Sequence, residues 1–236
     1  MSRDFFVARG VAIHYNYHAM KLESEGILIG LRPISERDSV ASIFTREYGT
    51  LSGVMRGAIV AKKNRPLVGQ IGFAAWNARL DSQLGAFHWE STQNVGAPLM
   101  MDAKKLGFMN SAFALVMALL PEREEYTRLY DSTINMLRNL GTGDSEYTYL
   151  NWEIDLLHDL GYALDLSRCS GCGRVGHLNY LSTKTGRAVC DDCAAPYMDK
   201  VYKLPMNLDI TGHFIARICD QMGVNMPVAR VYLSRQ

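Results

Sequence analysis

The sequence lacks the segments that would take it into or across a membrane. It contains no apolar run of about 18 or more residues, so no transmembrane helix is predicted. Its first 20 residues mix charged and aromatic side chains and do not follow the basic, apolar, small-residue order of a secretory signal. The 236 residues are 48% hydrophobic and 21% charged, which fits one or two globular domains. We therefore expect a cytosolic protein.

Signatures of nucleotide hydrolysis and of common hydrolases are also missing. There is no G-x-x-x-x-G-K-[ST], G-x-S-x-G or H-E-x-x-H motif, so no P-loop ATPase, α/β-hydrolase or zincin is predicted. The acidic run at 122–125 follows Pro121 at an expected helix start, where carboxylates favour the helix dipole. We interpret this run as a cap and not as a carboxylate pair for a metal ion.

Cysteine is scarce, but four of the five cysteines form two close pairs. Cys169 and Cys172 are followed by Cys190 and Cys193 in the pattern C-x2-C-x17-C-x2-C, which is within the zinc-ribbon range. In a reducing cytosol this pattern indicates metal binding and not disulfides. Four thiolates complete the tetrahedral shell of Zn²⁺ and leave no position for water. We predict one structural zinc ion that performs no chemistry.

The zinc ion would order a segment with few apolar residues of its own, because zinc binding can supply on the order of 10 kcal/mol toward folding. The alternative is that the four cysteines are buried and reduced without a metal. Cys219 is interpreted as a small core residue and not as a fifth ligand. His177 falls inside the ribbon, but four thiolates already fill the shell.

The net charge of +1 conceals an uneven distribution along the chain. Residues 27–80 contain eight basic and three acidic side chains, a net charge of +5. Residues 81–236 contain 14 basic and 18 acidic side chains, a net charge of −4. Polyanion binding is therefore predicted for the first part of the chain.

Short β-prone runs separated by turn residues occupy the same first part. The runs cover 26–31, 39–45, 50–56, 70–79 and 85–90. Five short strands within about 70 residues predict a small barrel. A basic loop containing Lys62, Lys63 and Arg65 separates the third and fourth runs.

Aromatic residues are interleaved with these basic residues, as in proteins that bind single-stranded nucleic acid. Basic side chains would neutralise phosphates, and an aromatic face could stack a base, an interaction worth about 1 to 3 kcal/mol. The oligonucleotide-binding barrel is a common host for this arrangement. We favour nucleic-acid contact for the basic loop. For the aromatic residues we favour the alternative, a place in the barrel core; they are Phe44, Tyr48, Phe73 and Trp76.

After Pro98 the apolar period changes from two residues to about 3.6, which indicates helices. Pro121 is expected to end the first helix, and Gly141 and Gly161 to end the next two. Asp209 is a candidate N-cap for the last helix. The expected helices cover 106–120, 131–140, 145–160 and 210–221.

Several segments in this order resemble the RecO family of bacterial recombination mediators. They are EGILI (25–29), SVASIFTREYG (39–49), MRGA (55–58), LLPERE (119–124), WEIDLLHDLGY (152–162), LDLSRC (164–169) and LDITGHF (208–214). No single segment is as specific as a P-loop. Their order from Met20 onward, over nearly the whole chain, is specific.

The resemblance implies an α+β protein with an amino-terminal OB-fold barrel and a helical carboxy-terminal domain that carries the inserted four-cysteine zinc ribbon. It implies no enzymatic activity. Proteins like this bind single- and double-stranded DNA, anneal complementary strands, contact the acidic tail of the single-strand-binding protein, and join RecR to load RecA. Carried onto this sequence, the DNA surface comprises Arg32, Arg37, Arg46, Arg56, Lys62, Lys63 and Arg65. For the acidic-tail pocket of the helical domain the candidates are Arg128 and Arg138.

The resemblance also predicts the domain boundaries. We expect an OB-fold domain at 20–95 and a helical domain at 96–236 with the zinc ribbon at 166–196. Residues 1–19 are expected to be a disordered extension, because members of the family begin near the position of Met20. Some members lack the four cysteines, which agrees with a structural metal.

Two other functions remain open from the residues alone. One is a metal-dependent enzyme that processes nucleic acid and uses the ribbon as an accessory, although the sequence shows no clear Asp/Glu/His cluster for it. The other is an adaptor that contacts only proteins and retains no DNA at low salt.

Overall fold

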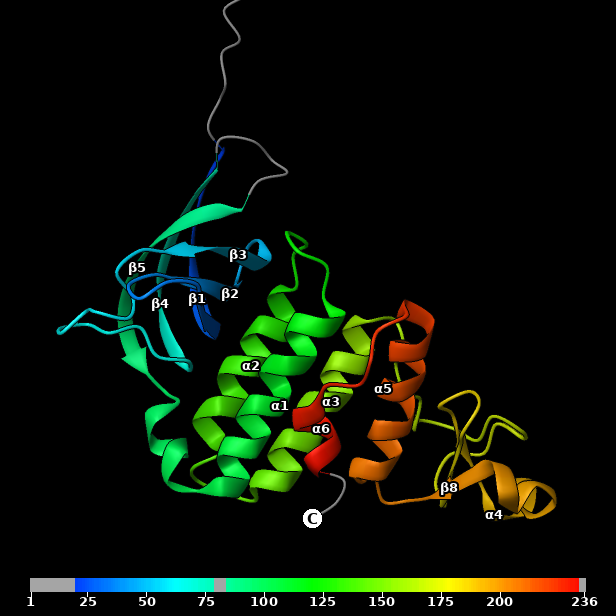
Figure 1. The fold of residues 1–236 in the computed structure, drawn as a ribbon. Helices are drawn as coiled ribbons and strands as arrows, with labels where there is room; N and C mark the ends of the chain where they lie inside the picture. Colours follow the sequence, from blue (N-terminus) through cyan, green and yellow to red (C-terminus); the bar gives the residue numbers. More distant parts are fainter. Residues whose placement is uncertain (1–19, 79–83, 234–236) are drawn as a thin grey trace, which may run out of the picture.

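Five β-strands at the start of the described chain close into a barrel (Figure 1). The computed structural model describes residues 20–78 and 84–233, so the predicted extension at 1–19 lies outside the described residues. The order around the barrel is β1-β2-β3-β5-β4, in which β3 and β5 are parallel. This arrangement matches the five-stranded OB-fold, as predicted. The strands are β1 (Met20–Pro33), β2 (Ser39–Thr45), β3 (Gly49–Met55), β4 (Gln70–Ala78) and β5 (Gly85–Asn94).

Strand β1 begins at Met20, six residues before the predicted start, and pairs with both β2 and β4. Its first residues alternate between polar and apolar and are only half-buried, so the continuous apolar run that predicted the strand begins later. The register shifts between Leu28 and Gly30, which marks a β-bulge. Such a bulge bends a strand, and here it lets one long strand belong to both sides of the barrel.

Trp76 fills the barrel interior and sets a steric requirement on its neighbour. Its side chain is only 1% exposed, and its indole N–H donates to the carbonyl of Ser52 at 2.9 Å. A Cβ atom at Gly85 would lie 2.2 Å from this indole, so only glycine fits at the start of β5. The prediction of a core position is correct for this residue.

The second part of the chain is helical, and no helix among the described residues is long and apolar enough to cross a membrane. Asp102, Asp144 and Asn207 cap α1, α3 and α5 by accepting backbone N–H groups. Helix α1 ends just before Pro121, as predicted. The elements are the 3₁₀ turn η1 (Ala97–Met101), α1 (Ala103–Leu119), α2 (Thr127–Asn139), α3 (Ser145–Asp159), α5 (Leu208–Met222) and α6 (Val228–Leu233).

Three sequence-based expectations about this region were wrong. Asp209 does not cap α5, because the helix already begins at Leu208 and Asn207 is its N-cap. Helix α2 begins at Thr127, not at residue 131, and the short helix α6 was not predicted. The acidic run at 122–125 does not cap a helix, because its backbone pairs with the barrel: Glu122 forms β-bridges with Gly49 and Thr50. Helix α2 has no acidic residue in its first turn.

Barrel and helices share one hydrophobic core. Ile27, Ile29, Phe44 and Ile71 of the barrel belong to the same buried cluster as the apolar faces of α1, α2, α3 and α5. Arg46 in the β2–β3 turn forms a two-point ion pair with Asp131 of α2, at 2.9 and 3.1 Å. The predicted boundary at 95/96 therefore stays a prediction of chain organisation, because apolar contacts cross it.

A small three-stranded sheet, of order β7-β6-β8, carries the cysteines and is inserted between α3 and α5. In Figure 1 it lies beyond α5, on the side of the helices opposite the barrel. Its elements are β6 (Tyr180–Ser182), β7 (Ala188–Val189), α4 (Asp191–Ala194), the 3₁₀ segment η2 (Ala195–Lys200) and β8 (Val201–Lys203). We refer to residues 166–203 as the ribbon.

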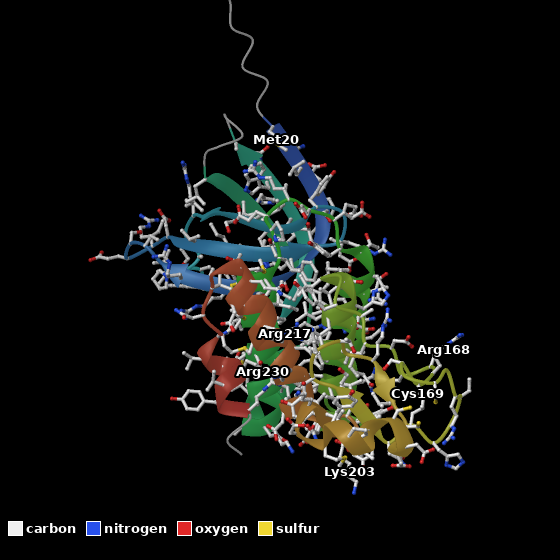
Figure 2. The ribbon with its side chains drawn as sticks, turned by 90° about the vertical axis from the view of Figure 1, so that its right-hand side faces the viewer. Met20, Arg168, Cys169, Lys203, Arg217 and Arg230 are labelled. Atoms are coloured by element: carbon white, nitrogen blue, oxygen red, sulfur yellow. The ribbon has the colours of Figure 1, made fainter. Side chains whose placement is uncertain are left out.

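A buried charge pair ties the helices together. Glu153 of α3 and Arg230 of α6 are 0% and 1% exposed, and the guanidinium binds both carboxylate oxygens. Nη2 of Arg230 also donates to the Leu208 carbonyl at 2.6 Å, at the start of α5. Figure 2 shows Arg230 against the helices, far from the barrel end marked by Met20.

Hydrogen bonds extend this pair to α1. Tyr149 donates its hydroxyl hydrogen to Glu153 at 2.7 Å and contacts the Ser111 hydroxyl of α1 at 2.7 Å. Burial, and then the charge of Glu153, raise the pKa of Tyr149 far above its usual value, so the phenol stays a donor. Ser111 therefore donates to Tyr149. The Glu153 carboxylate accepts from Tyr149 of α3 and Arg230 of α6, and Ser111 links α1 to it through Tyr149.

Substitution of Glu153 by Gln is expected to destabilise the fold by about 3 to 5 kcal/mol, because it leaves the Arg230 charge buried without its partner. Urea unfolding followed by circular dichroism measures this change. The control is Glu146→Gln, which removes the exposed ion pair with Lys104 and should cost less than about 1 kcal/mol. Equal stability of the two variants would contradict the role of the buried pair.

Candidate metal centre and nucleic-acid interface

The four cysteines of the ribbon converge on one point. The Sγ atoms of Cys169, Cys172, Cys190 and Cys193 all lie within 4.8 Å of one another. Those of Cys172 and Cys190 are 3.7 Å apart. A tetrahedral site with metal–sulfur bonds of about 2.3 Å places its sulfurs about 3.8 Å apart. The cluster therefore has the size of a four-thiolate metal site.

Backbone donors prepare this cluster for negative charge. The N–H groups of Cys190 and Gly171 both point at the sulfur of Cys169 at 3.4 Å. Backbone N–H groups, that of Cys190 first and then those of Cys172 and Gly171, lower the pKa of Cys169 to about 6, which favours its thiolate form. Gly171 must be glycine, because a Cβ there would lie 2.9 Å from the Cys193 sulfur.

The fourth sulfur, that of Cys193, shows that the cluster needs a positive charge at its centre. Hydrogen bonds from the protonated thiol of Cys193 to its three sulfur neighbours, Cys190 first, raise its pKa to about 12, and burial and the charge of Cys169 add less, so this sulfur keeps its proton without a cation in the cluster. A divalent ion at the centre supplies that cation and favours all four thiolates at once. The donor set and its geometry thus fit a structural metal ion with a complete shell.

The two other candidate ligands are not part of the cluster. Cys219 is 2% exposed on α5 within the main core, as predicted. His177 is exposed and lies outside the cysteine cluster. The ribbon has a core of its own that is small, with the buried residues Cys169, Val189, Cys190 and Ala194. A metal ion bound by the four cysteines would therefore supply much of the local stability.

Helix α5 holds the ribbon through the turn between β6 and β7. Arg217 of α5 donates to the carbonyls of Thr183 and Lys184 at 3.0 and 2.9 Å. His213 contacts the Thr183 carbonyl at 3.1 Å and packs edge-on against Tyr202 of β8. Figure 2 places Cys169 at the outer side of the ribbon and Arg217 against the helices. The metal cluster thus braces a segment that is anchored on α5.

The predicted DNA surface divides into two groups, of which the first lies at one end of β1–β3. Ser39 pairs with both Pro33 and Met55, so the residues that flank these strands come together. Asp38 accepts the Gly57 N–H at 2.8 Å, and the Arg37 carbonyl accepts the Ile59 N–H at 3.1 Å. These bonds join the two loops that follow β1 and β3. The basic residues gathered there are Arg32, Arg37 and Arg56.

The second group lies on the β3–β4 loop, which projects away from the helices and is cyan in Figure 1. Gln70 fixes the base of this loop, because its side chain accepts from Leu67 N–H and donates to the Arg65 carbonyl. Lys62, Lys63 and Arg65 are exposed. Within residues 20–78 and 84–233, none of the six basic residues of the two groups forms an ion pair. Their charges are available to phosphates.

Arg46 differs from these six. It is half-buried, and the two carboxylate oxygens of Asp131 accept from Nε and Nη2 on one edge of its guanidinium and raise its pKa. Its position serves the junction between barrel and helices. Its assignment to the DNA surface stays a prediction.

The predicted core positions of the four aromatic residues hold to different extents. Phe44 and Trp76 are buried, and Tyr48 is half-buried against the barrel core. Phe73 is 47% exposed on β4, so its ring remains accessible for stacking. Sequence reasoning missed Arg123, whose guanidinium lies 4.8 Å above the Trp76 ring.

The two candidates for an acidic-tail pocket lie on α2 in different surroundings. Arg128 binds Asp159 at 2.6 Å and the Asp155 carbonyl at 3.2 Å, so acids already neutralise it. Arg138 contacts only the neutral side chain of Gln93, at 3.4 Å, within the described chain. The structure does not bring the two arginines into one pocket among those it shows.

The fold and the site define a class of proteins with an OB barrel that carries basic residues, a helical bundle, and a ribbon whose four cysteines could hold a metal ion. Two family models match this chain: "Recombination protein O N terminal" over residues 20–88 and "Recombination protein O C terminal" over residues 100–212. The chain belongs to the RecO family, and the resemblance inferred from the sequence is confirmed.

Curated relatives agree over most of the chain. A protein of Roseobacter denitrificans named DNA repair protein RecO is 37% identical over 79% of this chain and 78% of its own length. One of Cereibacter sphaeroides with the same name is 33% identical over 91% of this chain and 97% of its own length. One of Rickettsia bellii is 32% identical over 79% and 77%.

Replacing Cys169 and Cys172 by Ser is expected to abolish metal binding and to lower the melting temperature, because two of four ligands are lost. Elemental analysis and thermal unfolding measure both effects. Cys219→Ala is the matched control, since it removes a cysteine outside the cluster and should keep one metal ion per chain. A double variant that retains its metal would disprove the site.

Proposed function

We propose that this chain is a recombination mediator in DNA repair. It binds single- and double-stranded DNA, anneals complementary single strands and helps RecA load on DNA coated with single-strand-binding protein. It hydrolyses no nucleotide and catalyses no bond cleavage. The observation that carries this proposal is the set of six unpaired basic residues on an OB barrel, at Arg32, Arg37, Arg56, Lys62, Lys63 and Arg65.

Membership of the RecO family supports the same role, since its curated members are named DNA repair proteins. The two basic groups lie at the β1–β2 and β3–β4 loops. Phe73 has an exposed ring on strand β4, which pairs with β1. Phosphate neutralisation and base stacking without base-edge readout suit a protein that must accept any sequence. Arg46 would then act mainly by orienting the barrel through Asp131.

The proposed protein partners are RecR, the acidic tail of the single-strand-binding protein and, indirectly, RecA. For the acidic tail Arg138 is the better of the two candidates, because Arg128 is already bound to Asp159. We place the protein in the cytoplasm, associated with the nucleoid during repair. The metal is proposed to be one zinc ion, since a tetrahedral four-thiolate shell suits Zn²⁺.

The competing enzyme hypothesis has less support. Among the residues that the structure describes, the cysteine cluster is the only group of three or more His, Cys, Asp or Glu side chains placed to hold a metal ion. A complete four-thiolate shell has no open position for a substrate or a nucleophilic water. We therefore favour the mediator.

Reversing Lys62, Lys63 and Arg65 to Glu is expected to weaken binding of single-stranded DNA, because three phosphate contacts on the β3–β4 loop are lost. The slope of log K against log salt should become less negative by about 0.7 per lost contact, or about 2 in total. Fluorescence anisotropy with a labelled oligonucleotide measures both quantities. Reversal of Arg138, Arg168 and Lys203, which lie outside the barrel, changes the net charge by the same amount and is the control. An unchanged slope in the barrel variant would reject this surface.

Incubation of labelled DNA with the protein and Mg²⁺ is expected to leave the DNA intact, while complementary strands anneal faster than without protein. Gel electrophoresis reads both outcomes, with and without single-strand-binding protein. Cleavage products would favour the enzyme hypothesis. Failure to retain any DNA at low salt would favour an adaptor that contacts only proteins.

A further inference from the structure

A cavity of about 450 Å³ lies on the ribbon, beside the metal cluster. The β6–β7 turn forms one wall, and the segment η2 with the start of β8 forms the other. Cys193 reaches its edge, but the metal ion would sit between the four sulfurs and would not fill a space of this size. The proposed function does not use this cavity.

Three cations from separate positions line the cavity: Lys184 on the turn, Arg187 before β7, and Lys200 at the end of η2. None of them forms an ion pair within residues 20–78 and 84–233. The lining contains no carboxylate, and its other polar side chains include the hydroxyls of Ser182 and Thr185. Unpaired cations together with hydroxyl donors make a site for phosphate oxygens.

The cations are held on a fixed frame. The Lys200 carbonyl accepts both the N–H and the hydroxyl of Thr183, at 3.1 and 3.0 Å, which joins the two walls. Arg217 of α5 fixes the turn from behind by donating to the carbonyls of Thr183 and Lys184. The site is therefore formed before a ligand arrives, and little order has to be gained on binding.

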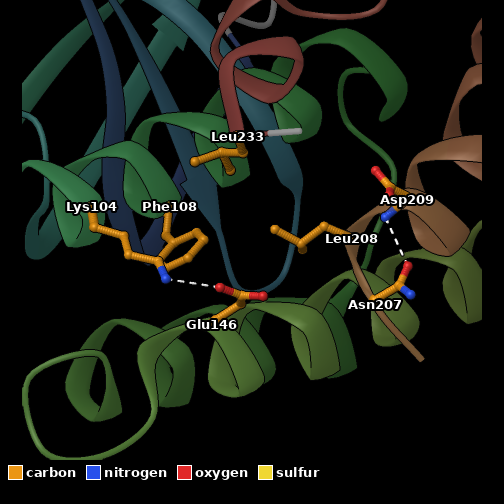
Figure 3. A pocket seen from close by; sticks show the side chains of 7 residues that line it. All are labelled: Lys104, Phe108, Glu146, Asn207, Leu208, Asp209 and Leu233. Atoms are coloured by element: carbon orange, nitrogen blue, oxygen red, sulfur yellow. Dashed lines mark hydrogen bonds and ion pairs between the residues drawn. The ribbon is translucent and has the colours of Figure 1, made fainter. Parts of the chain in front are cut away.

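A second cavity provides a contrast, with about 570 Å³ between the ends of α1, α3, α5 and α6 (Figure 3). Its one lysine, Lys104, is bound to Glu146 at 2.8 Å. Asn207 is occupied in capping α5, where it accepts the Asp209 N–H at 3.1 Å. The carboxylates of Glu146 and Asp209 face the same space, so this cavity offers no net attraction to an anion.

An aromatic ring completes the cationic cavity. Tyr197 lines it and is 56% exposed. Its backbone departs from helical geometry within η2, which separates this residue from a regular helical face. Aromatic rings of this kind stack the unpaired bases of single strands.

The charge of the ribbon differs from that of its surroundings. Residues 166–203 contain six basic and three acidic side chains, a net charge of +3. The rest of the region 81–236 contains eight basic and 15 acidic side chains, a net charge of −7. When net charge is counted over the whole of residues 81–236, the acidic residues around the ribbon cancel its positive charge. The ribbon is thus a second basic segment, set in acidic surroundings.

We propose that the cavity lined by Lys184, Arg187, Lys200 and Tyr197 is a second binding site for single-stranded DNA, in which the cations hold phosphates and Tyr197 stacks a base. The inference rests on the proposed DNA-binding function. The ribbon and the barrel lie on opposite sides of the helices in Figure 1, so the two sites face different regions of solvent. One chain can then hold two strands, or two separated parts of one strand.

The test uses the full-length protein with its metal and a fluorescein-labelled 30-nucleotide oligothymidine. Reversal of Lys184, Arg187 and Lys200 to Glu is expected to weaken binding by at least about tenfold and to make the salt slope less negative by about 2. The matched control reverses Arg138, Arg168 and Lys203, which lie outside the cavity lining, form no ion pair within residues 20–78 and 84–233, and give the same change in net charge. The control should retain most of the affinity and its salt slope.

Tyr197 gives an independent variant that leaves charge unchanged. Tyr197→Ala is expected to weaken oligothymidine binding at least about fivefold, and Tyr197→Phe should restore it, because the ring and not the hydroxyl stacks. Metal content and melting temperature should match the unsubstituted protein for both, since the side chain is exposed.

Each outcome discriminates. Loss of affinity in the cavity variants but not in the matched control supports the second site, and the Lys62/Lys63/Arg65 reversal is then expected to lose affinity as well. Unchanged binding in the cavity variants, with loss in the Lys62/Lys63/Arg65 reversal, overturns the second site and leaves the proposed function standing. Unchanged binding in both sets rejects both. If the cavity variants lose binding of a labelled acidic peptide but not of oligothymidine, the cavity is a protein site and the inference is wrong.

Discussion

The buried pair of Glu153 and Arg230 is the constraint on which the helical part of the molecule depends. A charge with no exposed surface is tolerated only when its partner and its hydrogen bonds are all in place. Here those partners come from α3, α5 and α6, and α1 is linked to them through Tyr149, so the network connects four helices. The ribbon is inserted in the chain between α3 and α5, two of the helices that this network connects.

The barrel is also held in place by contacts with the helices. The shared core around Phe44, the bridge from Glu122 to Gly49 and the Arg46–Asp131 contact connect the barrel to the helices through three different kinds of interaction. A Cβ atom at Gly49 would lie 1.8 Å from the Glu124 carbonyl oxygen, so close approach of the backbone is part of the junction. The basic loops project from a base that does not rotate freely against the bundle.

Local signals in the sequence were sufficient for much of the fold and for the metal site. The paired spacing of the cysteines and the arrest of α1 at Pro121 each depend on residues close together in the chain. The missed features depend on distant partners. Glu153 is a charge on a buried helical face, which periodicity treats as an exposed position, and only Arg230 from the far end of the chain explains it. The run at 122–125 resembled a cap because its barrel partner is about 70 residues away. The positive charge of the ribbon was not recognised, because net charge was counted over the whole of residues 81–236.

The insertion of the ribbon between two helices that are already locked has a consequence for its evolution. Its own buried core consists of Cys169, Val189, Cys190 and Ala194. It is attached to the helices through the β6–β7 turn on α5 and through Leu181, which is buried in the main core. Substitutions on the surface of such a segment leave the contacts within the helical bundle unchanged. Other stabilising contacts could also replace a metal ion in the ribbon without a change in the bundle. Selection can therefore act on the surface of the ribbon separately from the barrel and the helices.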